Sequence, residues 1–316
     1  MREPAYGVVL VNWNGIADTE SALDSLFASE PRPDHVVVVD NGSSDDSLPR
    51  LHAWVSRNHP VNGHTGTKNG VQRASPWVSI IAENENRGYA AGNNVGLTRL
   101  ATTTDTTHFL LLNNDATVAP DYFAQMSEAI REFPDSALLG CAIYYHANRD
   151  KVWFAGGYEL PYRALMLHRY ELPVSLAPQP TEFVTGCAMM ISRELYNARG
   201  GLAERYTPIY WEDTEYSFRA RNNGWRVMLV PSARVFHKVG ASVGGENITP
   251  QVAFWQNRHR GYYVRRNYRG VDRAVAIAYL IGTKPARALV ELLRGRTAMG
   301  SAIFRGFLHG LIDDSA

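Results

Sequence analysis

Residues 109–115 place the strongest constraint on how this chain folds. Four apolar residues at 109–112 run directly into Asn113, Asn114 and Asp115. Such a run is typical of a strand buried on both faces, as in a parallel sheet covered by helices. Ligands of open α/β sheets bind at the carboxyl ends of the strands, and a carboxylate beside amides suits a divalent cation that also binds phosphates. The alternative is a polar turn in which Asp115 accepts hydrogen bonds from backbone amides.

Short apolar strands alternate with helical stretches on both sides of this run. The predicted strands lie at residues 7–11, 36–39, 78–81, 137–144, 183–191, 227–230 and 234–237. The predicted helices of this part lie at residues 19–29, 90–100 and 122–133, around Leu51, and from Glu212 to Gly224. Residues 58–76 are predicted to form a surface loop, and residues 145–182 hairpins and loops. Alternation of this kind indicates a parallel sheet covered by helices.

Charge is distributed unevenly along the 316 residues. The formal net charge is +1, which gives no reason to expect nucleic acid as a partner. From Gln251 onward, however, 11 Lys and Arg face 4 Asp and Glu, a surplus of seven positive charges. This part also holds three predicted helices, at residues 255–268, 274–293 and 301–312. We therefore expect one domain over residues 1–250, with halves at about 1–115 and 116–250, and a basic helical region over residues 251–316.

Cysteine usage and the absence of long apolar stretches indicate a cytoplasmic protein. Cys141 and Cys187 both lie in apolar runs, and two cysteines cannot form a metal framework, so buried free thiols are expected. The N-terminus runs straight into a predicted strand and lacks the apolar core of a signal peptide. No stretch approaches the roughly 18–20 apolar residues that a membrane span needs.

Polar residues also follow two other predicted strands. Asp40 closes the strand at 36–39 as Asp115 closes the strand at 109–112, so the two carboxylates are expected at one edge of the sheet. Asp40 could accept from a nucleobase or ribose, or it could only cap the turn that follows. Arg87 and Gly88, ahead of a predicted helix, offer a cation and free backbone amides to phosphate.

Two further sites carry candidate chemistry in the second half of the chain. Trp211, Glu212 and Asp213 begin a predicted helix, whose dipole favours ionised acids and would keep a carboxylate available as a general base. The alternative is that Asp213 only caps the helix. His237 ends a strand in phase with inward-facing residues, so it is either a satisfied core histidine or a group that completes a site with Asp115.

Residues 255–268 interleave arginines with tyrosines. The residues are Arg258, Arg260, Arg265 and Arg266, with Tyr262, Tyr263 and Tyr268. This composition is typical of an amphipathic helix at an anionic membrane surface, with aromatic rings at the headgroup level. RNA binding and a solvated helix face are the alternatives.

Seven short motifs, taken in order, resemble the family-2 inverting glycosyltransferases of the GT-A fold. They are VNWNG at 11–15, VDNGSSD at 39–45, NENRGYAAGNN at 84–94, LNND at 112–115, TGC at 185–187, WED at 211–213 and HKVGAS at 237–242. Each is loose alone, but the ordered set spans about residues 6–245. Within the family the chain most resembles the bacterial rhamnosyltransferase-like branch, which builds surface polysaccharides.

The resemblance assigns roles to individual residues. For the nucleotide-sugar donor it implies Asn12, Asp40, Arg87, Gly88, Asn113 and Asn114. For the acceptor it implies Trp211 and Gly186, and for catalysis Asp213 as general base beside Glu212. Asp115 and His237 match metal-ligand positions for Mg²⁺ or Mn²⁺. The first acid of the family's Asp-x-Asp motif is replaced here by Asn113, which leaves fewer carboxylates for a metal.

The resemblance implies transfer of a sugar, first L-rhamnose from dTDP-rhamnose and otherwise a UDP-hexose, to a glycan or lipid-linked saccharide. Two alternatives are a sugar-1-phosphate nucleotidyltransferase and a binding module without catalysis. The first would carry a Gly-rich signature with Arg or Lys near the N-terminus, which residues 8–15 lack. The second does not require the acid at Asp213. The C-terminal helices are expected to bind an anionic membrane surface or a second subunit.

Overall fold

A mostly parallel sheet forms the centre of the computed structural model, which describes residues 3–58, 67–68, 71–72, 77–239 and 248–312. Its strands are β1 (Tyr6–Asn12), β2 (His35–Asn41), β5 (Val78–Glu83), β6 (His108–Asn113), β7 (Ala116–Val118), β8 (Ser136–Tyr145), β9 (Asn148–Phe154), β12 (Gln179–Pro180), β13 (Ala188–Ser192) and β14 (Arg226–His237). The main order is β12-β14-β8-β13-β6-β1-β2-β5, with β7 paired to β14 and β9 to β8. Because β13 runs antiparallel to β6 and β8, it marks the boundary between the two halves of the sheet.

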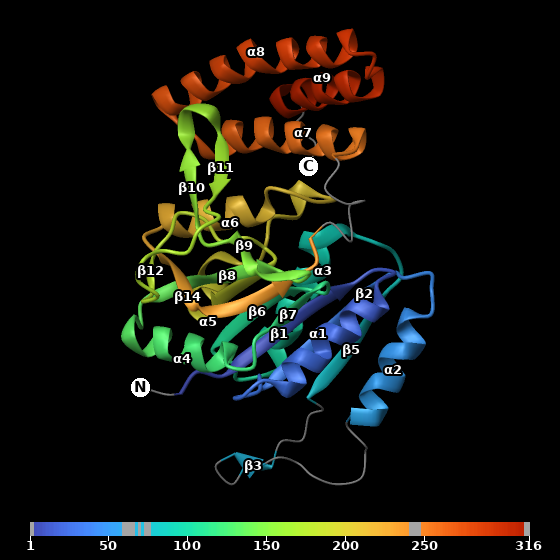
Figure 1. Ribbon diagram of the computed structural model, residues 1–316, viewed down its shortest axis with the longest axis vertical. Helices are drawn as coiled ribbons and strands as arrows, with labels where there is room; N and C mark the ends of the chain where they lie inside the picture. Colours follow the sequence, from blue (N-terminus) through green and yellow to red (C-terminus); the bar gives the residue numbers. More distant parts are fainter. Residues whose placement is uncertain (1–2, 59–66, 69–70, 73–76, 240–247, 313–316) are drawn as a thin grey trace.

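Helices cover both faces of this sheet, and three more stack at one end of the molecule (Figure 1). They are α1 (Ile16–Ala28), α2 (Ser47–Asn58), α3 (Gly88–Thr103), α4 (Tyr122–Glu132), α5 (Arg193–Arg199), α6 (Glu212–Asn222), α7 (Pro250–Asn267), α8 (Gly270–Leu293) and α9 (Thr297–Ile312). Two short hairpins pair β3 (Thr67–Lys68) with β4 (Val71–Gln72), and β10 (Gly157–Leu160) with β11 (Leu165–His168). Single 3₁₀ turns lie at Pro161–Arg163 and Glu204–Tyr206.

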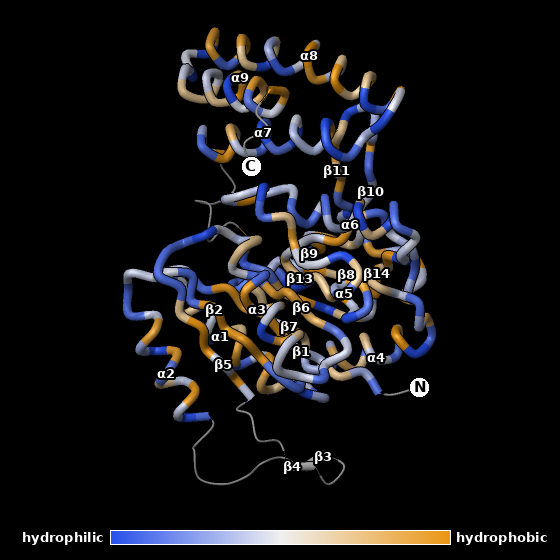
Figure 2. The backbone as a smooth tube through the Cα atoms, turned by 180° about the vertical axis from the view of Figure 1, so that it is seen from behind, coloured by the Kyte–Doolittle hydropathy of each residue, from blue (hydrophilic) through white to orange (hydrophobic). Residues whose placement is uncertain are grey.

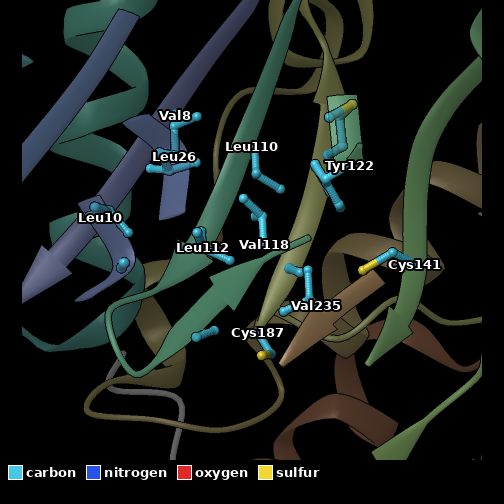
Figure 3. Packing of buried hydrophobic residues seen from close by; sticks show 14 of the residues in the cluster. Val8, Leu10, Leu26, Leu110, Leu112, Val118, Tyr122, Cys141, Cys187 and Val235 are labelled. Carbon is cyan, nitrogen blue, oxygen red and sulfur yellow. The ribbon is translucent and has the colours of Figure 1, made fainter. Parts of the chain in front are cut away.

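The apolar runs of the central strands are explained by this double cover. Val8 of β1 and Leu110 of β6 are in register and pack toward α1, α2 and α4, near Leu26 of α1 (Figure 3). Their neighbours Val9 and Leu111 point to the other face and pack toward α3, α5 and α6. Alternating residues therefore enter two separate cores, and a polar residue at either position would be buried without a partner.

The predicted helix-covered parallel sheet is confirmed, with differences in the second half. β14 is one strand where the sequence predicts two, at 227–230 and 234–237. Its register against β8 shifts between Val230 and Arg234, because Pro231 cannot donate to the ladder and the strand continues through an irregularity. β13 begins only at Ala188, and Phe183, Thr185, Gly186 and Cys187 of the predicted strand line a cavity instead. Most of the predicted loop 58–76, and residues 240–242 of the last motif, lie outside the described residues.

α7 packs on α6 and on the 3₁₀ turn that contains Tyr206, which corrects one prediction for residues 255–268. Tyr262, Tyr263 and Tyr268 are buried in a cluster with Tyr206 and Phe218, so their rings are not available to a membrane surface. The hydroxyl groups of Tyr263 and Tyr268 donate to the buried carboxylate of Glu159 on β10, which also pairs with Arg221 of α6. The interleaved pattern thus reflects one helix face packed on the core and one exposed to solvent.

α8 and α9 lie beyond α7, farthest from the sheet (Figure 1). Gly306 and Gly310 of α9 let it approach α7 closely, since a Cβ atom at Gly306 would lie 2.3 Å from the Phe254 carbonyl oxygen. At the turn between α8 and α9, the buried Glu291 carboxylate lies 2.6 Å from Arg296 and pairs also with Arg287 and Arg294. Among the described residues, no helix is long and apolar enough to cross a membrane.

Candidate functional site

A cavity of about 560 Å³ opens at the carboxyl end of β6. One wall is the edge of the sheet, a second is the start of α6 with the loop before β13, and α7 and α8 form a third. Its polar lining residues are Tyr89, Asn113, Asp115, His168, Thr185, Tyr210, Glu212, Asp213, Thr214, His237, Gln256, Asn257, Arg260 and Lys284. Gly186 and Trp211 line it too, so both predicted acceptor residues, both predicted acids and both predicted metal ligands face one space.

Strand pairing brings Asp115 and His237 together. β7 and β14 are antiparallel, with Ala116 opposite His237, so the residue before β7 lies beside the end of β14. The Asp115 Oδ1 atom is 3.1 Å from His237 Nε2, and both side chains are buried. The ring of Trp153 packs edge-on against His237 at 4.9 Å between centroids.

This pair fits a divalent cation that shares its coordination with a ligand. The His237 Nδ1 atom is buried without a hydrogen-bond partner in the described part of the chain, and Asp115 Oδ1 makes no well-aligned hydrogen bond. No group of three His, Cys, Asp or Glu side chains is arranged to hold a metal among the described residues. One carboxylate and one imidazole cannot enclose a cation, but Mg²⁺ and Mn²⁺ sites are commonly completed by water and substrate phosphates.

Asp213 is held in the cavity wall by backbone amides. Its Oδ2 atom accepts from the Gly186 N–H at 2.9 Å, and its Oδ1 atom lies 2.6 Å from the Thr214 amide. The Gly186 carbonyl in turn accepts from the Tyr89 hydroxyl at 2.6 Å. A Cβ atom at Gly186 would lie 2.8 Å from that hydroxyl oxygen, so only glycine allows the contact. The carboxylate therefore has a fixed direction, which a general base needs.

Burial raises the pKa of both acids at the start of α6, but their surroundings differ. Burial raises the pKa of Asp213, although the hydrogen bonds from Gly186 and Thr214 oppose the shift. Burial, followed by the charge of Asp213, raises the pKa of Glu212 well above its usual range. The Glu212 Oε2 atom has no hydrogen-bond partner among the described residues. The two carboxyl groups therefore lie in different environments, since backbone amides donate to Asp213 while one Glu212 oxygen has no such donor in the described part of the chain. The sequence predicts ionised acids at this helix start, and burial opposes the ionised form of both.

The backbone before these acids has an uncommon conformation. Tyr210 and Trp211 both have positive φ angles, of 75° and 80°, which cost about 1–3 kcal/mol each for residues with a side chain. His259 of α7 holds this segment, because its Nδ1 atom is 3.1 Å from the carbonyl oxygens of Ile209 and of Tyr210. Burial lowers the pKa of His259 to about 4, so the neutral ring donates from Nδ1. α7 thus helps to present Glu212 and Asp213 to the cavity.

The predicted donor residues Asn12 and Asp40 form a network at the ends of β1 and β2. Asn12 Nδ2 donates to Asp40 Oδ1 at 2.8 Å, and the Ser43 hydroxyl donates to the same oxygen at 2.6 Å. The Ser43 amide also approaches Asp40 Oδ2 at 3.3 Å, as in the turn-capping alternative. Both side chains are buried and lie outside the lining of the cavity.

Three other predicted donor residues lie at this edge but not in the cavity lining. Asn114 bonds to α1, through Thr19 Oγ1 at 3.2 Å. Arg87 pairs with Glu83 at 3.6 Å and with Glu204 at 3.7 Å. The Gly88 amide already donates to the Asn86 side chain at 2.9 Å, so it is not a free donor for phosphate. Of the predicted donor residues only Asn113 lines the cavity.

Several cavity residues are not predicted from the sequence. Tyr89 lies inside a motif but has no role assigned to it. His259, which lies outside the cavity lining and supports the segment before Glu212, carries no local signal either. Arg260 stands in the basic helix, where its pattern indicates a surface charge, and Lys284 is a lone lysine in α8. Only the docking of α7 and α8 on the rest of the fold brings Arg260 and Lys284 to the cavity.

The sequence matches known families over most of its length. Residues 7–200 match glycosyl transferase family 2, and residues 108–303 match glycosyl transferase family group 2. The chain belongs to glycosyl transferase family 2. This confirms the resemblance of the seven motifs and favours the glycosyltransferase over the nucleotidyltransferase and the binding module.

Relatives and solved structures agree with the family. N-acetylglucosaminyl-diphospho-decaprenol L-rhamnosyltransferase of Mycobacterium tuberculosis is 23% identical, over 81% of this chain and 85% of the relative. The glycosyltransferase is thus rhamnosyltransferase-like, as predicted. PcManGT, a mannosyltransferase from Pyrobaculum calidifontis in complex with GDP-Man and Mn²⁺, is 16% identical, with a TM-score of 0.57 over 100% of this chain and 89% of its own. GalNAc-T7 with UDP, GalNAc and Mn²⁺ is 17% identical, with a TM-score of 0.59 over 74% of this chain and 44% of its own. Both confirm the GT-A fold.

Proposed function

We propose that this glycosyltransferase moves a sugar from a nucleotide diphosphate to a hydroxyl group of a glycan or lipid-linked saccharide, with inversion. The first candidate donor is dTDP-L-rhamnose, and a UDP-hexose is the second. The observation that carries the proposal is Asp213, a carboxylate in the cavity wall whose direction the Gly186 amide fixes. The similarity to an L-rhamnosyltransferase of a diphospho-decaprenol acceptor supports the donor and acceptor classes.

The proposed reaction is a single displacement at the anomeric carbon. Asp213 accepts the proton of the acceptor hydroxyl while its oxygen forms the new bond to that carbon. The bond from the carbon to the diphosphate oxygen breaks, and the diphosphate leaves with the electron pair. Asp115 and His237 would hold Mg²⁺ or Mn²⁺, which supplies positive charge to the departing diphosphate. Attack from the opposite face inverts the configuration without a covalent enzyme intermediate.

The donor nucleoside is proposed to lie at the ends of β1 and β2. The Asn12–Asp40 pair is proposed to contact the base, since Asp40 is a fixed acceptor at the carboxyl edge of the sheet. Arg87 and Gly88 are proposed to flank the nucleotide, and Asn113 and Asn114 to approach the ribose and diphosphate. Binding would then require Arg87 to exchange its two acidic partners for the ligand.

A thermal-shift screen tests the donor class. We expect dTDP or UDP to stabilise the protein by roughly 2.7 kcal/mol at a hundredfold excess over Kd, and more with Mn²⁺ than with EDTA. GDP and ADP, which carry the same diphosphate on a purine base, serve as control ligands and should stabilise the protein less. A screen in which no nucleotide diphosphate raises the melting temperature would contradict the proposed function.

We propose that α8 and α9 attach the enzyme to an anionic membrane surface, where a lipid-linked acceptor resides. Hydrophobic and hydrophilic residues alternate along α8 and α9 (Figure 2). The large apolar side chains that are exposed on these two helices are Val271, Val275, Ile281, Leu289, Val290, Leu292, Leu293, Phe304, Leu308 and Ile312. The basic surplus after Gln251 supports an anionic partner, since each basic residue near such a leaflet contributes about 1 kcal/mol. A second copy of the chain is the alternative occupant of this face.

Vesicle flotation tests the membrane proposal. The full-length enzyme should float with anionic vesicles, and high salt or the double substitution Leu293→Asp with Phe304→Asp should abolish flotation. Val174→Asp, at a fully exposed valine between β11 and β12, is the matched control and should float normally. Dimers in sedimentation without flotation at low salt would instead assign the apolar face to a second subunit.

A further inference from the structure

Two cations of the C-terminal helices face the catalytic cavity. Arg260 of α7 and Lys284 of α8 line it together with Gln256 and Asn257. Asp115 lines the same cavity from the edge of the sheet. Since α6 lies between the sheet and α7, the two cations and Asp115 enter the cavity from different sides (Figure 1). The basic helices therefore contribute to the interior of the site as well as to the surface.

Neither cation has an acidic partner in the described part of the chain. Arg260 donates through one terminal nitrogen to the Arg163 carbonyl, while its Nε atom is buried without a hydrogen-bond acceptor. Lys284 has no hydrogen bond or ion pair among the described residues. By contrast, Arg287 on the same helix as Lys284 pairs with Glu291 at 3.0 Å.

The two charges are close enough to act on each other. Burial, and next the charge of Arg260, lowers the pKa of Lys284 to about 8. Placing two like charges in a partly buried space without a counter-ion is unfavourable, and the fold keeps both. A ligand with two or more negative charges would relieve this repulsion and satisfy the unpaired donors.

We propose that Arg260 and Lys284 form a binding site for a phosphate or diphosphate group of the acceptor. This assignment rests on the proposed function, in which the donor diphosphate lies by Asp115 and His237 and the acceptor enters from the opposite side of the reacting carbon. An anion on the α7 and α8 side then belongs to the acceptor. The enzyme would select acceptors that carry a diphosphate linkage over neutral glycans.

The test compares two ligands by calorimetry on the full-length protein. The first is n-hexyl diphosphate in the presence of EDTA, as a soluble analogue of a lipid diphosphate. The second is dTDP or UDP with Mn²⁺, as the donor product. We expect Lys284→Met and Arg260→Met each to lower the affinity for n-hexyl diphosphate at least tenfold. The affinity for the nucleotide should stay within twofold of wild type. Lys284→Arg, which keeps the charge, should retain most of the affinity, and Arg273→Met, at an exposed position of α8, should change neither ligand.

The outcomes separate this site from the proposed function. If the methionine variants lose affinity for both ligands equally, the two cations bind the donor and not the acceptor. If the wild-type enzyme does not bind n-hexyl diphosphate, the proposed acceptor site is wrong. Unchanged binding in both methionine variants would also overturn it. In each of these cases the acceptor site fails. The proposed function still stands if the wild-type enzyme binds the nucleotide with Mn²⁺. Lys284→Met keeps the length of the side chain and removes an unpaired charge, so an unaltered circular dichroism spectrum is expected.

Discussion

Asp213→Asn is expected to lower the rate of sugar transfer by at least about 10²–10⁴-fold, the usual contribution of a general base. The asparagine carbonyl can still accept from the Gly186 amide, so the side chain should keep its direction, although it loses the contact with the Thr214 amide. It cannot accept a proton, however, so the acceptor hydroxyl would attack without deprotonation. Affinity for the donor should stay within a few-fold, because Asp213 acts on the acceptor. Comparable turnover in this variant would remove Asp213 from the role of base.

The matched control is Glu215→Gln, in the same first turn of α6. Glu215 pairs with Arg219 at 3.1 Å and lies outside the cavity lining, so activity should stay within a few-fold of wild type. The pH profile gives a second readout. Because the pKa of Asp213 is raised, the base takes up a proton at a higher pH than the roughly 3.9 of an ordinary aspartate. As the pH is lowered, the activity of the wild-type enzyme should therefore begin to fall at a pH above that value. The residual activity of Asp213→Asn should not show this acidic decline.

The elements that local sequence could predict are those fixed by burial. The apolar runs of β1, β2 and β6 predict a sheet covered on both faces, and their polar ends predict the edge where Asn113 and Asp115 lie. The inward phase of His237 is confirmed, since its side chain is buried. These features depend on short-range patterns, with a period of two or an abrupt change of polarity, which a sequence displays directly.

The features that escaped prediction depend on tertiary packing. The tyrosines of α7 have the same local pattern whether they face lipid or protein, and only the buried Glu159 shows why they point inward. Likewise, no spacing predicts that His259 supports the segment before Glu212, or that Lys284 reaches the cavity. The hydrogen-bond partners of Tyr263, Tyr268 and His259 lie at least 49 residues away along the chain. Such long-range contacts carry no periodic signal.

Asp115→Ala is expected to abolish the dependence of nucleotide-diphosphate binding on Mg²⁺ or Mn²⁺. It should also lower transfer by at least about 100-fold, since a cation contributes several kcal/mol to charge stabilisation at a leaving group. His237→Ala should have the same effect more mildly, because Asp115 would remain as a ligand. Calorimetry of dTDP or UDP with Mn²⁺ and with EDTA measures the first effect without relying on turnover.

The structure offers a sharp control for that result. Asp121→Asn removes a carboxylate that pairs with Arg234 of β14 at 3.5 Å but does not line the cavity. This variant should therefore still bind the nucleotide diphosphate in a metal-dependent way. The Asp115 backbone carbonyl accepts from the Lys238 amide at 3.0 Å, and the alanine variant keeps this contact, so loss of the fold is not expected. If EDTA leaves the wild-type activity unchanged, neither Asp115 nor His237 is a metal ligand. Their contact of 3.1 Å would then be an ordinary buried carboxylate–imidazole pair that joins β7 to β14.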